Sequence, residues 1–192
     1  ILFQFCQCGY CKEWCVSSYD APAFVRAGRA DAVKLGFIPQ PVQAVIESLD
    51  IYGHPFGCEI NSHCSKTRTG SEIKTDGKPN CRTLLYLGAF ARYLRPEVGK
   101  AAISLLRKLD IDFTLLEDEP NSGYYYYNLG FIEKGEKQSK KVVDAFKNGG
   151  YKTILVISPA DYYTMTNEYD KKLLEDAGIK ITPLVSLISS LD

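Results

Sequence analysis

Neither positive nor negative charge is in excess in this chain. Its 192 residues include 23 basic and 23 acidic side chains, which gives a formal net charge of zero. Proteins that bind nucleic acid usually carry a basic surplus, so we expect no nucleic-acid partner. No apolar run approaches the length that spans a bilayer. The sequence also lacks a charged leader with an apolar core and a small-residue cleavage site, so we predict no signal peptide and expect a cytoplasmic location.

Histidines are few, and no nucleotide-binding fingerprint is present. The two histidines, His54 and His63, both lie in the cysteine-bearing part of the chain, which leaves no supported Ser-His-Asp or Cys-His arrangement. The Gly-rich stretches match neither the dinucleotide nor the P-loop fingerprint, so no nucleotide site is expected. An initiator Met is missing too, and we expect the chain to be a fragment.

Cysteine, by contrast, is plentiful and clustered. Four of the seven cysteines fall within one short segment: Cys6, Cys8, Cys11 and Cys15. A secreted disulfide scaffold would spread its cysteines and pair them evenly, so this cluster indicates metal binding in a reducing compartment. Cys8, Cys11 and Cys15 fit the last three positions of the C-x2-C-x2-C-x3-C run that binds a 4Fe–4S cluster. Phe5 occupies the first position, and Cys6 is the candidate substitute.

A second pair of cysteines, Cys58 and Cys64, lies where another such run would be expected. Only Cys64 is in register, and the crossover rule makes it the fourth ligand of the cluster held by Cys8 and Cys11. The other cluster would have only Cys15 with Cys58 or a histidine, so we expect one cluster rather than two. A zinc site is the alternative.

Three residues of this part have simpler interpretations. We expect His54 and His63 to be solvated loop histidines. Cys81 is expected to be a linker thiol or a small buried apolar residue.

The turn-forming residues 76–80 divide the chain into two predicted domains, 1–78 and 79–192. In the second domain, apolar runs alternate with amphipathic segments, which favours a parallel sheet flanked by helices. The expected strands are residues 83–87, 112–116, 153–157 and 180–182. The expected helices begin at Pro96 and Ile132, and two more cover residues 171–176 and 184–191.

Ligands of open parallel sheets bind at the carboxyl ends of the strands. The loops expected there are residues 88–95, 118–127 and 158–163, which should converge on one crevice. The tyrosines at 124–127, 162 and 163 could line it, although packing at helix starts is the commoner role. Arg92 and Arg95 could bind an anionic substrate or partner, or remain solvated.

The run Cys8-Gly-Tyr-Cys11-Lys-Glu-Trp-Cys15, followed by Arg26-Ala-Gly28, resembles the ferredoxin module of heterodisulfide reductase D-type subunits. Their relatives include the iron–sulfur subunits of glycolate oxidase, lactate oxidase and anaerobic glycerol-3-phosphate dehydrogenase. Residues 84–191 resemble the CCG domain of these proteins. The resemblance implies a small, mainly helical cluster-binding module followed by an α/β CCG-type domain, and a complete subunit would usually contain a further CCG domain.

The family's CCG cysteines, which bind a noncubane cluster, a 4Fe–4S cluster or zinc, are all replaced in this chain. The replaced positions are Ala89, Asn121, Ser122, Ser158 and Asp161. Neutral oxygens and one carboxylate do not reproduce a thiolate site. Either the domain is naturally degenerate, or these positions are engineered or misassigned, and only the second interpretation allows another cluster or zinc here.

The resemblance implies an iron–sulfur electron-transfer subunit of a heterodisulfide reductase-like, 2-hydroxyacid or glycerol-3-phosphate oxidoreductase complex. Its partners would be a flavoprotein or other iron–sulfur subunits, with peripheral membrane association through them. The expected ligands are Cys8, Cys11, Cys15 and Cys64, with Cys6 and Cys58 as further candidates. The alternatives are a metal-free CCG-like scaffold and a zinc-stabilised interaction module.

Overall fold

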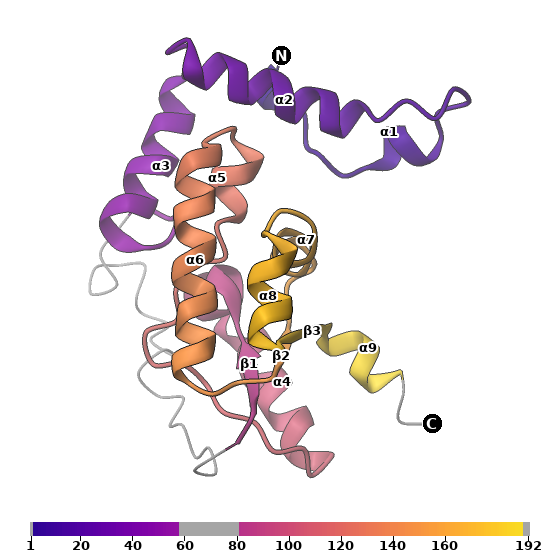
Figure 1. The fold of residues 1–192 in the computed structure, drawn as a ribbon, viewed down its shortest axis with the longest axis vertical. Coiled ribbons are helices and arrows are strands. Elements are labelled where there is room, and N and C mark those ends of the chain that lie inside the picture. Colours follow the sequence, from indigo (N-terminus) through magenta and orange to yellow (C-terminus); the bar gives the residue numbers. More distant parts are fainter. Residues whose placement is uncertain (1, 58–80, 190–192) are drawn as a thin grey trace.

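The computed structural model describes residues 2–57 and 81–189. Cys58, His63 and Cys64 lie outside the described residues, and so does the predicted domain boundary at residue 78. The chain is mixed α/β, as predicted, with a helical N-terminal part and a small parallel sheet covered by helices (Figure 1). No described helix combines the length and the apolarity needed to cross a membrane.

The N-terminal part consists of helices alone in the described range 2–57. A 3-10 turn (η1, Leu2–Gln4) and a single helical turn (α1, Tyr10–Glu13) precede α2 (Ala21–Lys34) and α3 (Gln40–Tyr52). The carboxylate of Asp20 caps α2 by accepting from the backbone N–H of Ala23 at 3.0 Å, and prolines occupy the first turns of α2 and α3, where an N–H would be unpaired anyway.

The α/β part contains three strands in the order β1-β2-β3, all parallel. The strands are β1 (Thr83–Tyr86), β2 (Thr153–Val156) and β3 (Lys180–Pro183). The other elements are η3 (Phe90–Leu94), α4 (Pro96–Lys108), α5 (Tyr124–Asn128), α6 (Ile132–Asn148), α7 (Pro159–Asn167), α8 (Lys171–Ala177) and α9 (Leu184–Ile188). Three of the four expected strands and all four expected helices are therefore present.

The expected strand at 112–116 is wrong in extent. Only Thr114 pairs with β1, through a parallel bridge to Leu84, because its N–H and C=O bond to Thr83 and Leu85, each at 2.9 Å. The carbonyl groups of Leu116 and Glu117, two and three residues further on, accept from the Arg92 guanidinium instead. The segment therefore leaves the sheet after one residue.

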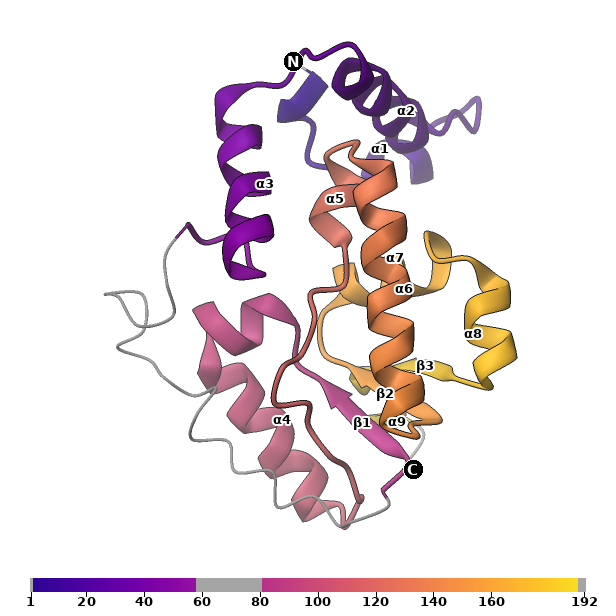
Figure 2. The ribbon, with the colours of Figure 1, turned by 60° about the vertical axis from the view of Figure 1, so that its left-hand side comes forward.

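Alternate strand residues face opposite layers, as the pleat of a strand requires. Leu84, Tyr86, Ile154 and Val156 pack in one core with residues of α6 and α7. Leu85, Leu87 and Leu155 pack in a second core against α4 and Leu184. β1 and β2 are thus buried on both faces, whereas β3 is only partly buried. Figure 2 shows α4 and α6 on opposite sides of the sheet.

The helical N-terminal part packs against α5 and the turn that follows it (Figures 1 and 2). Ile46 and Leu49 of α3 form a small core with Tyr126 of α5. The carboxylate of Asp50 accepts from the Tyr126 hydroxyl at 2.9 Å and pairs with Lys134 at 2.5 Å. Segments far apart in sequence thereby place the cysteine loop next to the α/β part.

Candidate functional site

The cysteine loop brings two of its four thiols together. Cys6 and Cys8 are exposed, and the backbone N–H and thiol of Cys8 both hydrogen-bond to the Cys6 sulfur, which lowers the pKa of the Cys6 thiol. Gln7 between them has a positive φ of 61°, and Gly9 follows at 81°. The left-handed region is rare for a residue other than glycine, so the loop turns sharply at this pair.

The Cys15 thiol has hydrogen-bond partners of its own. The Cys15 sulfur contacts the Ser17 hydroxyl at 3.1 Å and accepts from the Tyr19 backbone N–H at 3.3 Å, and these hydrogen bonds lower the pKa of its thiol. Cys11 is half-buried. Four thiols in one loop suit an iron–sulfur cluster chemically. In the described ranges, however, no three Cys, His, Asp or Glu side chains gather closely enough to hold a metal ion.

A buried arginine anchors the loop to the α/β part. Arg29 of α2 is 1% exposed and donates to the backbone oxygens of Leu2 and Phe5, the latter at 2.6 Å. It also donates to the backbone oxygen of Asn128 at 2.8 Å and to its Oδ1 at 3.2 Å. Burial lowers the pKa of Arg29. Removing this side chain would leave several enclosed oxygens without donors, which is costly.

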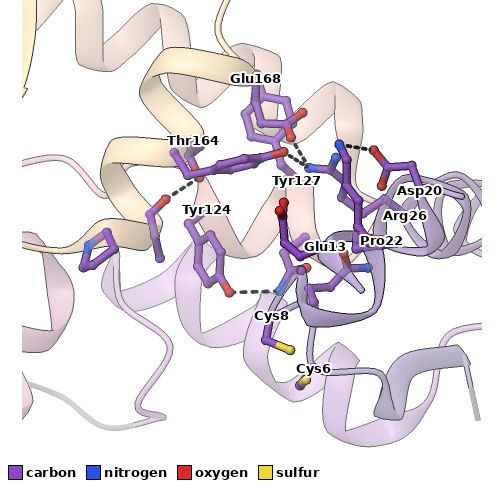
Figure 3. A pocket seen from close by; sticks show the side chains of 17 residues that line it. Cys6, Cys8, Glu13, Asp20, Pro22, Arg26, Tyr124, Tyr127, Thr164 and Glu168 are labelled. Carbon is purple, nitrogen blue, oxygen red and sulfur yellow. Dashed lines mark hydrogen bonds and ion pairs between the residues drawn. The ribbon is translucent and has the colours of Figure 1, made fainter. Parts of the chain in front are cut away.

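A cavity of about 540 Å³ opens between the cysteine loop and the α/β part (Figure 3). Cys6 and Cys8 line it from the loop, together with Lys12. Tyr124 of α5 and Tyr163 of α7 line it from the opposite side. The cavity thus joins the predicted cluster segment to two of the three loops expected at the carboxyl edge of the sheet.

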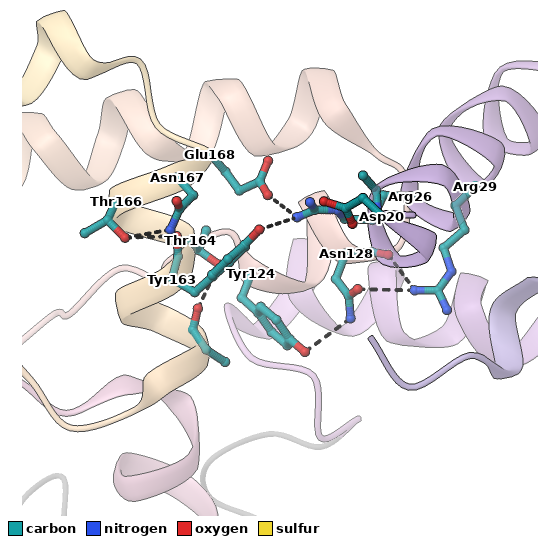
Figure 4. A network of polar contacts seen from close by, with 12 residues as sticks. Asp20, Arg26, Arg29, Tyr124, Asn128, Tyr163, Thr164, Thr166, Asn167 and Glu168 are labelled. Carbon is teal, nitrogen blue, oxygen red and sulfur yellow. Dashed lines mark hydrogen bonds and ion pairs between the residues drawn. The ribbon is translucent and has the colours of Figure 1, made fainter. Parts of the chain in front are cut away.

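Four of the charged residues around this cavity form two ion pairs. Arg26 forms an ion pair with Glu168 and donates to the Tyr163 hydroxyl at 3.2 Å (Figure 4). Lys12 pairs with Asp20 at 2.6 Å, which raises the pKa of Lys12 and lowers that of Asp20. The two ion pairs draw α1, α2 and α7 together around the cavity.

The three loops expected at the carboxyl ends of the strands do meet. The Ser122 hydroxyl donates to the Asp161 carboxylate, and the Ser158 hydroxyl accepts from the Asp161 backbone N–H at 3.3 Å. A Cβ at Gly88 would collide with the Asp161 carboxylate. Burial raises the pKa of Asp161. Three of the five replaced CCG positions are therefore bonded to one another.

The remaining two replaced positions are used differently. The Asn121 side chain turns back on its own loop and accepts from the Gly123 N–H at 3.0 Å. The Asn121 backbone carbonyl accepts from the Gln138 side-chain amide at 2.8 Å. Ala89 lies half-buried just before η3. Asn121 thus stabilises the turn that leads into α5, and Ala89 contributes no donor or acceptor side chain.

Glu119 is a residue of this edge that sequence analysis missed. Its carboxylate accepts from the backbone N–H groups of Leu87 and Gly88, each at 2.8 Å. Burial raises its pKa from 4.5 to about 7, and the Asp161 carboxylate adds to the rise. Nothing in the local pattern around Glu119 singles it out from Glu117 and Asp118, because its partners lie 31 and 32 residues earlier.

The tyrosines divide between packing and lining. Tyr126 is buried and bonded to Asp50, and Tyr162 packs against the core of the sheet. Tyr124 and Tyr163 line the cavity. Tyr127 does both, since it lines the cavity and is buried in the core of the sheet.

Arg92 and Arg95 also differ. Arg92 binds backbone oxygens of Leu116 and Glu117, so it stabilises a loop of its own chain. Arg95 is exposed and paired with Glu97. Cys81 is half-buried, and its thiol donates to the Thr83 carbonyl at 3.5 Å, which agrees with the expected linker thiol.

The expectation that His54 is solvated was wrong. Gly53 ends α3 in the left-handed conformation and turns the chain so that His54 is 2% exposed. Its ring packs against those of Tyr52, Phe56 and Tyr93, and burial lowers its pKa. The aromatic neighbours provide an apolar environment that the loop-like composition of this segment did not indicate.

Comparison with known proteins gives one partial similarity. No family model matches the chain, and no solved structure matches it. The chain is similar to Lactate utilization protein A of Bacillus subtilis (strain 168), with 27% identity over 93 residues. The matched region covers 48% of this chain and 37% of that protein, so the chain spans little more than a third of the length of its relative.

Proposed function

We propose that this chain is a redox subunit of a system that uses lactate or another 2-hydroxyacid, and that it carries an iron–sulfur cluster on its N-terminal cysteines. The name of the similar protein supports the metabolic role. The Cys8, Cys11 and Cys15 spacing supports the cluster. A flavoprotein or another iron–sulfur subunit would exchange electrons with it.

The observation that carries this proposal is the position of the cysteine loop. Arg29 holds the residues just before Cys6 against α5, and Cys6 and Cys8 face a cavity that α5 and α7 close from the other side. A cysteine-rich loop is thereby fixed beside the sheet edge where ligands of parallel sheets usually bind. A small, exposed zinc-binding loop would not need this buried anchor.

The residues proposed to hold the cluster are Cys8, Cys11, Cys15 and Cys64, with Cys6 and Cys58 as further candidates. A bound cluster would accept and release single electrons. The chain's contribution would be to set the reduction potential through burial and hydrogen bonds to sulfur. Two ion pairs, Lys12–Asp20 and Arg26–Glu168, offset most of the charge around the cavity.

Anaerobic purification of the full chain, with quantification of iron, zinc and acid-labile sulfide, tests the proposal. We expect iron and sulfide, and a visible absorption that dithionite bleaches. Cys8→Ser and Cys11→Ser should each lose most of the iron. Cys81→Ser is the matched control and should retain it, because Cys81 lies outside the motif and donates to the Thr83 carbonyl. Zinc without iron, or folded protein without metal, would contradict the proposal.

A second candidate function is a metal-free scaffold, and the sheet edge favours it for that part of the molecule. Ser122, Ser158 and Asp161 use their polar groups on one another, and Glu119 uses its carboxylate on backbone N–H groups. The polar groups at this edge of the sheet already have hydrogen-bond partners without a ligand. If the purified chain is folded and metal-free, this candidate replaces the first.

A further inference from the structure

Two cysteines of the loop are placed together in a way that the cluster motif does not require. Cys6 and Cys8 flank a single residue, Gln7, in the left-handed conformation, both are exposed, and both line the same cavity (Figure 3). In the ferredoxin spacing Cys6 is out of register. Its place beside Cys8 therefore calls for an explanation of its own.

The backbone on both sides of this pair is fixed. Upstream, Arg29 binds the carbonyl oxygen of Phe5, the residue before Cys6, at 2.6 Å. Downstream, the carbonyl of Gly9, the residue after Cys8, accepts from the Lys12 N–H at 2.9 Å and begins α1. Between them Gln7 adopts its positive φ of 61°. A bridge across one intervening residue closes a small ring, and a turn at that residue brings its two ends together.

We propose that Cys6 and Cys8 form a reversible disulfide when the chain carries no metal. Their shared turn at Gln7 already brings the two cysteines towards each other, so little further loop-closure entropy is lost on bonding. Cys15 has no such neighbour in the described part of the loop, since Ser17 and Tyr19 occupy its sulfur.

A hydroperoxide is a suitable oxidant, and the step balances. The Cys6 thiolate attacks one oxygen, the O–O bond breaks, and the products are a sulfenic acid and water or an alcohol. The Cys8 thiol then attacks the Cys6 sulfur, the S–O bond breaks, and a second water leaves as the S–S bond forms. Two thiols lose two electrons and two protons in total, and a dithiol reductant reverses the change by thiol–disulfide exchange.

The disulfide has a consequence that rests on the proposed function. Cys8 is a proposed cluster ligand and Cys6 is the candidate substitute for the first ligand, and a disulfide sulfur is not a thiolate ligand. Oxidation would therefore prevent cluster assembly, and reduction would restore it. The pair would act as a redox-sensitive gate on metal loading.

Intact mass and peptide mapping of the full, metal-free chain test the disulfide directly. After full reduction and treatment with one equivalent of hydrogen peroxide, the chain should lose the mass of two hydrogen atoms. Cleavage after Lys12 gives one peptide with Cys6, Cys8 and Cys11. The Cys11→Ser and Cys15→Ser variants should still form the bridge, whereas Cys8→Ser should stop at a sulfenic acid or form no intramolecular bridge.

Two results would overturn the disulfide. One is a bridge that disappears in Cys11→Ser, which would assign it to a pair that includes Cys11. The other is persistence of free thiols at both Cys6 and Cys8, shown by alkylation, under conditions that oxidise them in the urea-unfolded chain. Because the same thiols are oxidised in the urea-unfolded chain, their persistence in the folded chain could not be explained by a general resistance to peroxide.

Iron uptake separates this inference from the function on which the gate rests. The reduced chain should take up iron and sulfide anaerobically, the oxidised chain should take up several-fold less, and prior reduction should restore uptake. If the disulfide forms but the reduced chain binds no iron, the cluster proposal fails and the disulfide stands. If both forms take up iron equally, the gate is wrong.

Discussion

Glu119 shows how one side chain can link two loops. Its carboxylate binds the two N–H groups that follow β1, in the loops that carry the replaced CCG positions. Neighbouring Arg92 lowers its pKa and Asp161 raises it, but burial dominates and brings it to about 7. The carboxyl group therefore changes its charge near neutral pH, where an ordinary glutamate is fully ionised.

The sign of the resulting pH dependence follows from proton binding. Between pH 4.5 and about 7 the folded chain holds a proton on Glu119 that the unfolded chain releases, so the free energy of unfolding falls as pH rises through this range. Part of the residue contacts solvent, which reduces the effect, and we expect on the order of 2 kcal/mol. Urea unfolding of Glu119→Gln should lack this decline.

Comparing the two chains across the pH range isolates Glu119 from other titrating groups. Asp161, whose pKa is also raised, is present in both chains, so the difference between the curves reports Glu119 together with its coupling to Asp161. Asp20 and Glu97 have lowered pKa values, so their contribution is lost only as pH falls below the usual carboxyl range. Parallel curves for the two chains between pH 4.5 and 7 would contradict the assigned role of Glu119.

At the scale of elements, sequence patterns located the sheet but not its exact extent. Residues 83–87 and 153–157 are apolar runs next to turn residues, and such runs indicate buried strands. The run at 112–116 has the same pattern, yet it forms one bridge because Arg92 takes the carbonyls of Leu116 and Glu117. The local pattern of apolar residues contains no information about a side chain more than twenty residues away that binds the backbone carbonyls of the segment.

Contacts between elements far apart in the sequence could not be predicted from local patterns either. Arg29 and Asn128 are 99 residues apart, and an arginine in an amphipathic helix normally faces solvent. The convergence of Ser122, Ser158 and Asp161 could be predicted, because parallel strands end at one edge. The anchoring of the cysteine loop could not, because it depends on a buried side chain whose partners are backbone oxygens.

Gly130 tests the contact between α2 and the turn after α5. Its φ is 89°, and an added Cβ would lie 2.5 Å from the Arg29 carbonyl carbon. Gly150 has a similar φ of 70°, but a Cβ there would meet no atom within 4 Å. Gly150→Ala should therefore cost only the backbone strain, about 1 kcal/mol. Gly130→Ala should add an overpacking cost of about 1–3 kcal/mol.

Urea unfolding of the two variants measures this difference, and thiol labelling adds a second measurement. If Gly130→Ala pushes α2 away, the loop that Arg29 anchors should loosen, and Cys11 and Cys15 should react faster than in Gly150→Ala. Equal stability of the two variants would mean that α2 does not lie against this turn.

At the scale of the whole molecule, the helical part and the α/β part share enough contacts to unfold together. Arg29, the Gly130 turn and the small core of Ile46, Leu49 and Tyr126 all join them. Ile46→Ala should remove about 3 kcal/mol of packing. If the two parts form one cooperative unit, hydrogen-exchange protection of α3 and β2 should fall by the same free energy.

The alternative is that the N-terminal helices open on their own. Protection in α3 would then fall while β2 kept its original value, and the cysteine loop would open without unfolding of the sheet. Val185→Ala is the matched control, since this side chain is 71% exposed and should leave both regions unchanged. A shared loss in α3 and β2 would mean that the helical part and the sheet unfold as one cooperative unit.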